Sequence, residues 1–276
     1  MRSASLVLFF IMLFHGAQAQ LVDGMDNESK LYAETKQVNQ FFRRFNGEED
    51  EKGERYYPGH KRYRNTQLRK QYLSLLFDGD NDRISPALKT QFAGYVLDES
   101  SPRILNFHGG NWFSEVHTTF LMNGKEQPVI LFMTLEKDHL GSKWVISRAF
   151  VPMFEPYFGR DTTRIGRFLH PLSHELDFMN LRKAFTERDS VSQFTEKTFL
   201  PDHLTLFLYE ITRGNLKFKT VNEVKFHFFQ IDGWYFELAR FNRPGYNTGW
   251  LIANLVQLKD DSEKDLLRKY LYYETH

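Results

Sequence analysis

The stretch EVKFHFFQIDGWYFELARFNRPGYNTGWLIANLVQL, residues 223–258, decides the expected fold. Its apolar residues, rich in aromatic side chains, run in short segments separated by turn-forming residues, which is typical of antiparallel strands. Asp232 and Gly233 fit a two-residue hairpin turn, because both residue types tolerate a positive φ. The stretch therefore predicts a meander of three antiparallel strands.

This turn predicts which side chains share a face of the sheet. His227 lies on one face, whereas Gln230, Tyr235 and Glu237 lie together on the other. Both faces are mostly apolar, so each needs a cover. We expect His227 to be a core or interface histidine whose hydrogen bonds are satisfied.

Gln230, Tyr235 and Glu237 are polar groups in an otherwise aromatic wall. Such groups are costly to bury without partners, so they either bond to neighbours or reach a cavity. If a ligand site exists, these three residues are the candidates, because together they would offer an amide, a phenol and a carboxylate. The alternative for Glu237 is a solvated sheet edge or an ion pair with an arginine.

An earlier block, residues 114–151, has the same organisation as residues 222–257. Glu115, Val116, Phe120 and Trp144 correspond to Glu223, Val224, Phe228 and Trp250, and Asn123-Gly124 takes the place of the later turn. Helical spacing precedes each block, in residues 31–45 and again at Phe178, Leu181, Ala184 and Phe185. The repeated order predicts a tandem duplication, although meanders of unrelated origin also look alike.

The helix followed by long hairpins ending at Trp144 and Trp250 resembles the cone-shaped, cystatin-like α+β fold of the nuclear transport factor 2-like superfamily. That superfamily includes ketosteroid isomerase and scytalone dehydratase. The resemblance implies two tandem cone-like domains, each with helices on a curved antiparallel sheet. It implies no activity, because no active-site pair of those enzymes matches this sequence by position.

We expect the domains to span residues 28–152 and 172–260, with a linker at 153–171 and a helix at 261–276 that begins with a cap at Ser262 and Asp265. Because the hairpin is apolar on both faces, the two sheets are predicted to pack back to back as a monomeric pseudo-dimer.

Residues 1–19 predict a secretory signal peptide, with Arg2, an apolar run at 6–14, and Ala17 and Ala19 before the cleavage site. The apolar run is too short for a membrane span. The chain has 36 basic and 35 acidic residues, so loss of Arg2 leaves a net charge of zero and no global attraction to nucleic acid. Cysteine is absent, which excludes disulfides and thiolate chemistry. We expect a periplasmic or secreted protein.

Three segments of the sequence resemble metal-binding or ligand-binding motifs. DGDNDR, residues 78–83, lacks the later residues of a calcium loop, so a solvated turn before a helix at Ser85-Pro86 is expected. His170 and His174 flank Pro171 without a third ligand, which favours linker roles over zinc. Residues 55–70 mix six basic residues with tyrosines, as glycan and nucleic-acid surfaces do, but an acidic run precedes them, which favours a solvated, partly mobile surface segment over a binding strip.

No catalytic signature was found, and no cofactor or metal is expected. The sequence favours a non-catalytic extracytoplasmic binding or assembly protein whose partner is an unknown small molecule or an envelope protein. The alternative is a small-molecule lyase or isomerase that uses a cone-shaped cavity.

Overall fold

The computed structural model describes residues 38–50, 52–139, 141–158, 182–186, 191, 194–196, 202–243 and 247–274. The predicted signal peptide, His170, His174, Phe178, Leu181 and most of the predicted linker lie outside these residues. Within them, no helix is both long enough and apolar enough to cross a membrane.

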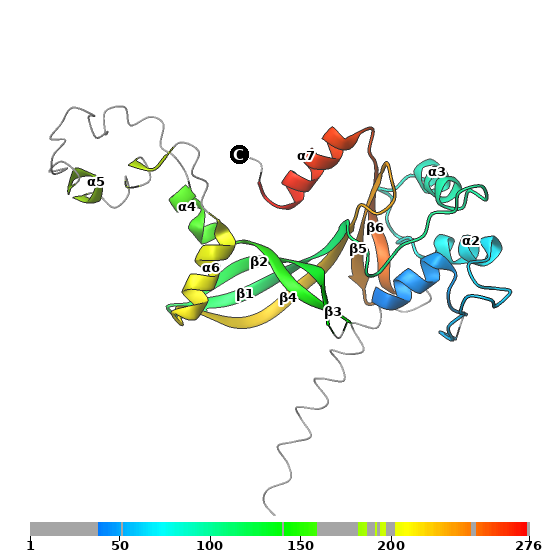
Figure 1. The fold of residues 1–276 in the computed structure, drawn as a ribbon, viewed down its shortest axis with the longest axis horizontal. Helices are drawn as coiled ribbons and strands as arrows, with labels where there is room; N and C mark the ends of the chain where they lie inside the picture. The colour runs from blue at the N-terminus through cyan, green and yellow to red at the C-terminus, as the bar shows by residue number, and fades with distance from the viewer. Residues whose placement is uncertain are drawn as a thin grey trace, which may run out of the picture. The chain divides into compact units, whose positions relative to one another are not determined.

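The described strands form one antiparallel sheet, which confirms the α+β class (Figure 1). Its order is β3-β2-β1-β4-β5-β6. The strands are β1 (Trp112–Met122), β2 (Lys125–Asp138), β3 (Gly141–Phe150), β4 (Leu216–Phe228), β5 (Trp234–Phe241) and β6 (Gly249–Gln257). Both predicted meanders are thus present as consecutive strands.

Two sheets packed back to back are not shown by this topology. Instead, β1 pairs with β4 in an antiparallel register that runs from Trp112 opposite Phe228 to Met122 opposite Leu216. Each meander would otherwise leave the backbone groups of an edge strand unpaired, and here the two edges bond to each other. The sequence showed that both meanders need cover, but not that they join by an edge.

The chain divides into two compact units. The first unit contains the described residues within Met1–Gly109, Gln230–Asp232 and Phe236–Leu255; the second contains those within Gly110–Phe229, Gly233–Tyr235 and Val256–His276. Each unit draws segments from both halves of the chain.

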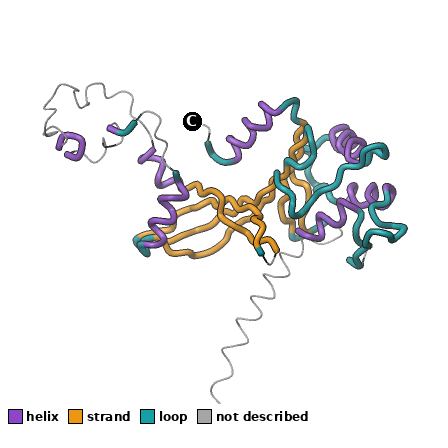
Figure 2. Tube along the Cα trace, in the orientation of Figure 1, coloured by secondary structure: helices purple, strands orange, loops and turns teal. Residues whose placement is uncertain are grey.

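The core of the first unit is aromatic. Residues 38–46 are helical and α3 (Pro86–Val96) lies against them, so that Phe45 and Phe92 both contact Phe236 of β5, with ring centroids 6.2 and 5.9 Å apart. Loops connect these helices and α2 (Thr66–Leu75), as Figure 2 shows in teal. As predicted, α3 begins at Ser85, whose hydroxyl accepts a hydrogen bond from the Leu88 amide, and Pro86 occupies its first turn.

A buried arginine joins three segments of the first unit. Arg69 of α2 is only 1% exposed, and its guanidinium donates hydrogen bonds to the backbone carbonyls of Phe45, Val96 and Arg103. Burial lowers the pKa of Arg69, and the charge of Arg64 lowers it further. Gly47 follows the first helix with a φ of 69°, which favours glycine, and a Cβ there would lie 2.8 Å from Arg69 Cγ.

The acidic loop after α2 is more than the solvated turn that was predicted. Asp78 is buried, and its carboxylate accepts a hydrogen bond from Arg243 at 2.6 Å, while Asp80 accepts another from the same guanidinium at 2.7 Å. The backbone beside Asp78 also extends the sheet, because Phe77 bridges to Ile252 of β6. An ion pair with a distant residue explains this burial, and the local sequence gives no sign of it.

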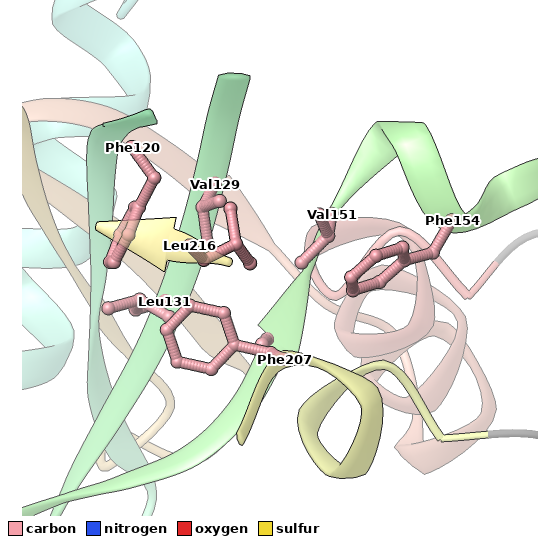
Figure 3. Close-up of a cluster of buried hydrophobic side chains, with 8 residues drawn as sticks. Phe120, Val129, Leu131, Val151, Phe154, Phe207 and Leu216 are labelled. Atoms are coloured by element: carbon pink, nitrogen blue, oxygen red, sulfur yellow. The ribbon is translucent and has the colours of Figure 1, made fainter. Parts of the chain in front are cut away.

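The second unit has a core beneath α6 (His203–Thr212). Phe207 of α6 packs among buried side chains from β1, β2, β4 and the turn Pro152–Phe154, as Figure 3 shows; the labelled residues are Phe120, Val129, Leu131, Val151, Phe154, Phe207 and Leu216. The Asp202 carboxylate caps α6 by accepting hydrogen bonds from the amides of Leu204 and Thr205. A short helix, α4 (Glu155–Phe158), follows the turn.

Two further helices test predictions about the second half. The C-terminal helix α7 (Asp261–Leu271) is present, but its cap is Asp260, which accepts from the Glu263 amide, rather than the predicted Ser262 and Asp265. The cap lies two residues earlier because Glu263 bonds back to the Lys259 amide. Only α5 (Arg182–Thr186) is described in the expected second helix, and there Phe185 is 65% exposed rather than part of a core.

Candidate functional site

The first unit contains an open hollow of about 850 Å³. One wall is formed by the helix at 38–46, drawn blue in Figure 1, and by α2; the other is formed by the end of β5 and the start of β6. Phe41, Leu75 and Trp250 supply apolar surface. A hollow of this size, with apolar walls and a few polar groups, is typical of ligand sites.

The polar groups of this hollow are amides and arginines. Gln40, Gln71 and Asn242 offer both donors and acceptors, while Arg44 and Arg240 carry positive charge. Among the described residues that line the hollow there is no carboxylate and no imidazole. The side chains present can bind and orient a ligand, but they include none of the usual acid or base residues that would move a proton at neutral pH, apart from one tyrosine.

Tyr72, which is that tyrosine, and Arg44 both bond to the buried residue Glu49. Glu49 is fully buried, and its two oxygens accept hydrogen bonds from the Nε atoms of Arg43 and Arg44, each at 2.8 Å. Tyr72 donates its hydroxyl proton to the Glu49 backbone carbonyl at 3.1 Å. The site is therefore rigid on this side, because Arg44 and Tyr72 are fixed before any ligand binds.

A second hollow, of about 680 Å³, lies beside the first and shares Leu68 and Gln71 with it. Its lining comes from the loop before α2 and from α2 itself, and it includes Lys52, Tyr56 and Lys61. Tyr56 and Lys61 belong to the basic, tyrosine-rich segment 55–70, for which the sequence favours a solvated surface. Tyr56 stacks on His60 with ring centroids 4.4 Å apart, which holds its ring in place.

The second unit contains a cluster of catalytic-type residues centred on Glu115 of β1. His227 Nε2 lies 2.8 Å from Glu115 Oε2, and His227 Nδ1 lies 2.8 Å from the Tyr235 hydroxyl. The other carboxylate oxygen, Oε1, lies 2.7 Å from His117 Nε2 and accepts the Tyr273 hydroxyl proton at 3.2 Å. Glu115 and His117 share a face of β1, and His227 lies diagonally across the β1–β4 pair.

Burial and hydrogen bonding act in opposite directions on Glu115. Burial raises the pKa of the carboxyl, but hydrogen bonds and positive charge from His227, and then from His117, outweigh burial and leave the pKa of Glu115 below its ordinary value. Burial, together with the neighbouring Glu115 charge, raises the pKa of Tyr273 to about 12. The cluster thus favours an ionised glutamate beside a neutral tyrosine.

The centre of this cluster is buried, whereas its rim is partly exposed, because the His117 side chain is 29% exposed and Tyr273 is 38% exposed. His227 is 0% exposed, Tyr235 1% and Glu115 5%, and none of the three lines either hollow. Every polar atom of the buried imidazole has a partner, which confirms the prediction that His227 is a satisfied core histidine. The buried and fully bonded imidazole indicates a structural role for His227.

The predicted faces of the second meander were wrong for Tyr235. The two-residue turn placed Tyr235 opposite the face of His227, yet the two side chains bond to each other and stack with ring centroids 6.0 Å apart. The reason is that β4 ends at Phe228 and β5 begins at Trp234, so residues 229–233 form a longer connection. A one-residue change of register moves every side chain to the other face.

Gln230 and Tyr235, two of the three predicted ligand residues, each bond to another residue, and the ligand site predicted from all three stays a prediction. Gln230 uses both ends of its amide on one residue: it donates to the Asn106 carbonyl at 2.8 Å and accepts from the Asn106 amide at 2.9 Å. The Tyr235 hydroxyl is hydrogen-bonded to His227 Nδ1. Glu237 is half-buried on β5 and is not among the residues that line either hollow, so its role in ligand binding stays a prediction.

Sequence reasoning missed the residues that do line the hollows. Gln40 and Arg44 lie on the predicted first helix, whereas Arg240 and Asn242 lie about two hundred residues later, and no local motif connects such distant segments. The Glu115 cluster did leave a signal. Glu115 and His117 are two residues apart in one strand, which places two titratable groups on a single face.

Within the part of the chain that the structure describes, no group of three or more His, Asp or Glu side chains is arranged to hold a metal ion. No family model, curated protein or solved structure matches this chain. The chemistry of its own residues is therefore the basis for assigning a function.

Proposed function

We propose that this chain is a non-catalytic binding protein whose ligand occupies the hollow lined by the helix at 38–46, α2, β5 and β6. The observation that carries the proposal is the lining itself: apolar walls, amides and two arginines, with neither carboxylate nor imidazole in the described lining. The catalytic-type residues Glu115 and His227 are buried in the second unit, where they satisfy one another. This separation argues against the lyase or isomerase alternative.

The fold and setting of this function are also proposals. Val116 lies opposite Val224 in the β1–β4 pair, and these are the two residues that the sequence comparison made equivalent. Equivalent residues meet in this way when two copies of a motif pair about a local two-fold axis. This supports a tandem duplication of the nuclear transport factor 2-like type, in a periplasmic or secreted protein.

The binding site can be tested by filling it. Gln71 is exposed on α2 and lines both hollows, so Gln71→Trp puts a large ring where the ligand would lie. Gln91→Trp is the matched control, because Gln91 is an exposed glutamine on α3 that lines neither hollow. Both variants and the wild type would be screened by thermal shift against metabolites and soluble oligosaccharides.

We expect compounds that raise the melting temperature of the wild type and of Gln91→Trp but leave Gln71→Trp unchanged. Compounds that stabilise all three proteins equally would place binding elsewhere and contradict the proposed site. Conversion of a bound compound into a product, followed by mass spectrometry, would contradict the absence of catalysis.

A further inference from the structure

The two hollows of the first unit share Leu68 and Gln71, so they lie along one side of α2. At a rise of about 1.5 Å per residue, the ten residues of α2 extend about 15 Å. A ligand that follows this helix can contact both hollows at once. That geometry suits an elongated molecule better than a compact one.

The charged side chains that line the two hollows are mostly positive. Among the described lining residues, the basic ones are Arg44, which is paired with the buried Glu49, and Lys52, Lys61, Arg62 and Arg240; the acidic one is Asp50. The Asp50 carboxylate already accepts hydrogen bonds from the backbone amides of Lys52 and Glu54. Because the whole chain is close to neutral, this local excess of positive charge is a property of the site and favours an anionic ligand.

The neutral groups of the lining narrow the class of ligand. Gln40, Gln67, Gln71 and Asn242 each carry a donor and an acceptor on one amide, which matches the paired donor and acceptor character of vicinal hydroxyl groups. Tyr56 at one end and Trp250 at the other supply aromatic surface. A pyranose ring presents a C–H face to such a ring and its hydroxyls to surrounding amides.

An acidic peptide fits these observations less well. Extended peptides are commonly bound by adding a strand to a sheet edge. At β6 that edge is already in use around Ile252, whose amide donates to the Leu76 carbonyl at 2.7 Å and whose carbonyl accepts from the Asp78 amide at 3.1 Å. The recognition groups that remain in the hollows are side chains suited to hydroxyls and acidic groups.

We propose that the ligand is an acidic oligosaccharide, with its sugar rings along α2 and its carboxylates at the basic side chains of the two hollows. This inference rests on the proposed function and names the class of molecule bound at that site. Arginine guanidinium groups suit the carboxylates of uronic acids, because both groups are planar and can form paired hydrogen bonds.

The test is isothermal titration calorimetry on the full chain at low salt with three probes: a galacturonate hexamer, its methyl ester, and hexaglutamate. The methyl ester keeps the sugar rings and removes the charge, while hexaglutamate keeps the charge and removes the sugars. We expect the hexamer to bind with one-to-one stoichiometry and the other two probes to bind at least about tenfold more weakly, a difference of about 1.4 kcal/mol.

The double variant Arg240→Gln, Lys61→Gln removes one charge from each hollow and should weaken the hexamer about tenfold or more. The control, Lys70→Gln with Arg83→Gln, removes two exposed charges of the first unit that line neither hollow and should leave the affinity unchanged. Circular dichroism would establish that both variants are folded.

Failure of the hexamer to bind, equal affinity for the methyl ester, or tighter binding of hexaglutamate would each overturn the inference. An equal loss of affinity in the control variant would overturn it as well. These outcomes are separate from failure of the proposed function, because another compound that is blocked only by Gln71→Trp would keep the binding site and change only the ligand class.

Discussion

The hollow of the first unit and the Glu115 cluster of the second unit both set polar groups among aromatic side chains, but they differ in what the polar groups do. In the hollow, the amides of Gln40 and Gln71 line open space. In the cluster, Glu115, His227 and Tyr235 bond to one another and are nearly or fully buried. Residue type alone therefore does not identify a site, because Glu115 and His227, which are of types often used in catalysis, are buried here and bond to each other.

The largest expected effect is loss of stability when the cluster is broken. His227→Phe would leave the Glu115 carboxylate and the Tyr235 hydroxyl buried without this partner, which should lower the free energy of unfolding by about 4 kcal/mol. Urea denaturation measures this change. His139→Phe, at an exposed turn, is the control and should change the free energy of unfolding by less than about 0.5 kcal/mol. Similar values for both variants would mean that the cluster has no structural role.

A comparable test in the first unit is Arg69→Met. The methionine keeps much of the apolar packing of the arginine stem but leaves the carbonyls of Phe45, Val96 and Arg103 without that donor. We expect a loss of about 3 kcal/mol in the free energy of unfolding. Arg83→Met, at an exposed position, is the control. If Arg69→Met left the free energy of unfolding unchanged, water would replace the guanidinium, and its hydrogen bonds would contribute little to stability.

The pH dependence of stability should reveal the contribution of Glu115. The pKa of Glu115 is lower in the folded protein than its ordinary value of 4.5, so its ionised form contributes stability that is present above pH 4.5 and is lost as the pH falls through the folded pKa. Glu115→Gln should be less stable at pH 6 and should lose less further stability on acidification to pH 3. Parallel wild-type and Glu115→Gln curves would show that another group governs the acid transition.

The smallest expected effect is on the stability of the hollow variants. Gln71 is exposed, so Gln71→Trp should shift the free energy of unfolding by less than about 0.5 kcal/mol while it blocks binding. A loss above about 1 kcal/mol would mean that the walls of the hollow contribute to the core. The contribution of Gln71 to ligand binding would then be measured with the smaller substitution Gln71→Ala.

The sequence predicted local features well where adjacent residues determine them. The turn at Asn123-Gly124 has positive φ at both residues and joins β1 to β2, and Ser85-Pro86 begins a helix. Each of these depends on steric limits or hydrogen bonds within a few residues. The meanders were predicted for the same reason, since alternation and turn chemistry are local properties.

The predictions failed where distant residues compete for the same backbone or side-chain partners. The connection between β4 and β5 spans residues 229–233 and is not a two-residue turn. Within it, the Gly233 carbonyl accepts a hydrogen bond from the distant Leu258 amide, which local turn preferences do not predict. The partners of Gln230 and Tyr235 likewise come from other segments. The walls of the hollow could not be assembled from sequence patterns, because they meet only after the strands have paired.

The pairing of β1 with β4 has a consequence for how the chain reaches its native state. Val116 must find Val224, more than a hundred residues later, and contacts of such long sequence separation slow folding. A ribosome-bound chain that has completed β1, β2 and β3 has the edge of β1 unpaired, in addition to the edge of β3, until β4 emerges. The β1 edge pairs with β4 in the native sheet, so β4 of a neighbouring nascent chain can compete for it. The delayed pairing of β1 with β4 is therefore the stage of folding at which misassembly between chains is most to be expected.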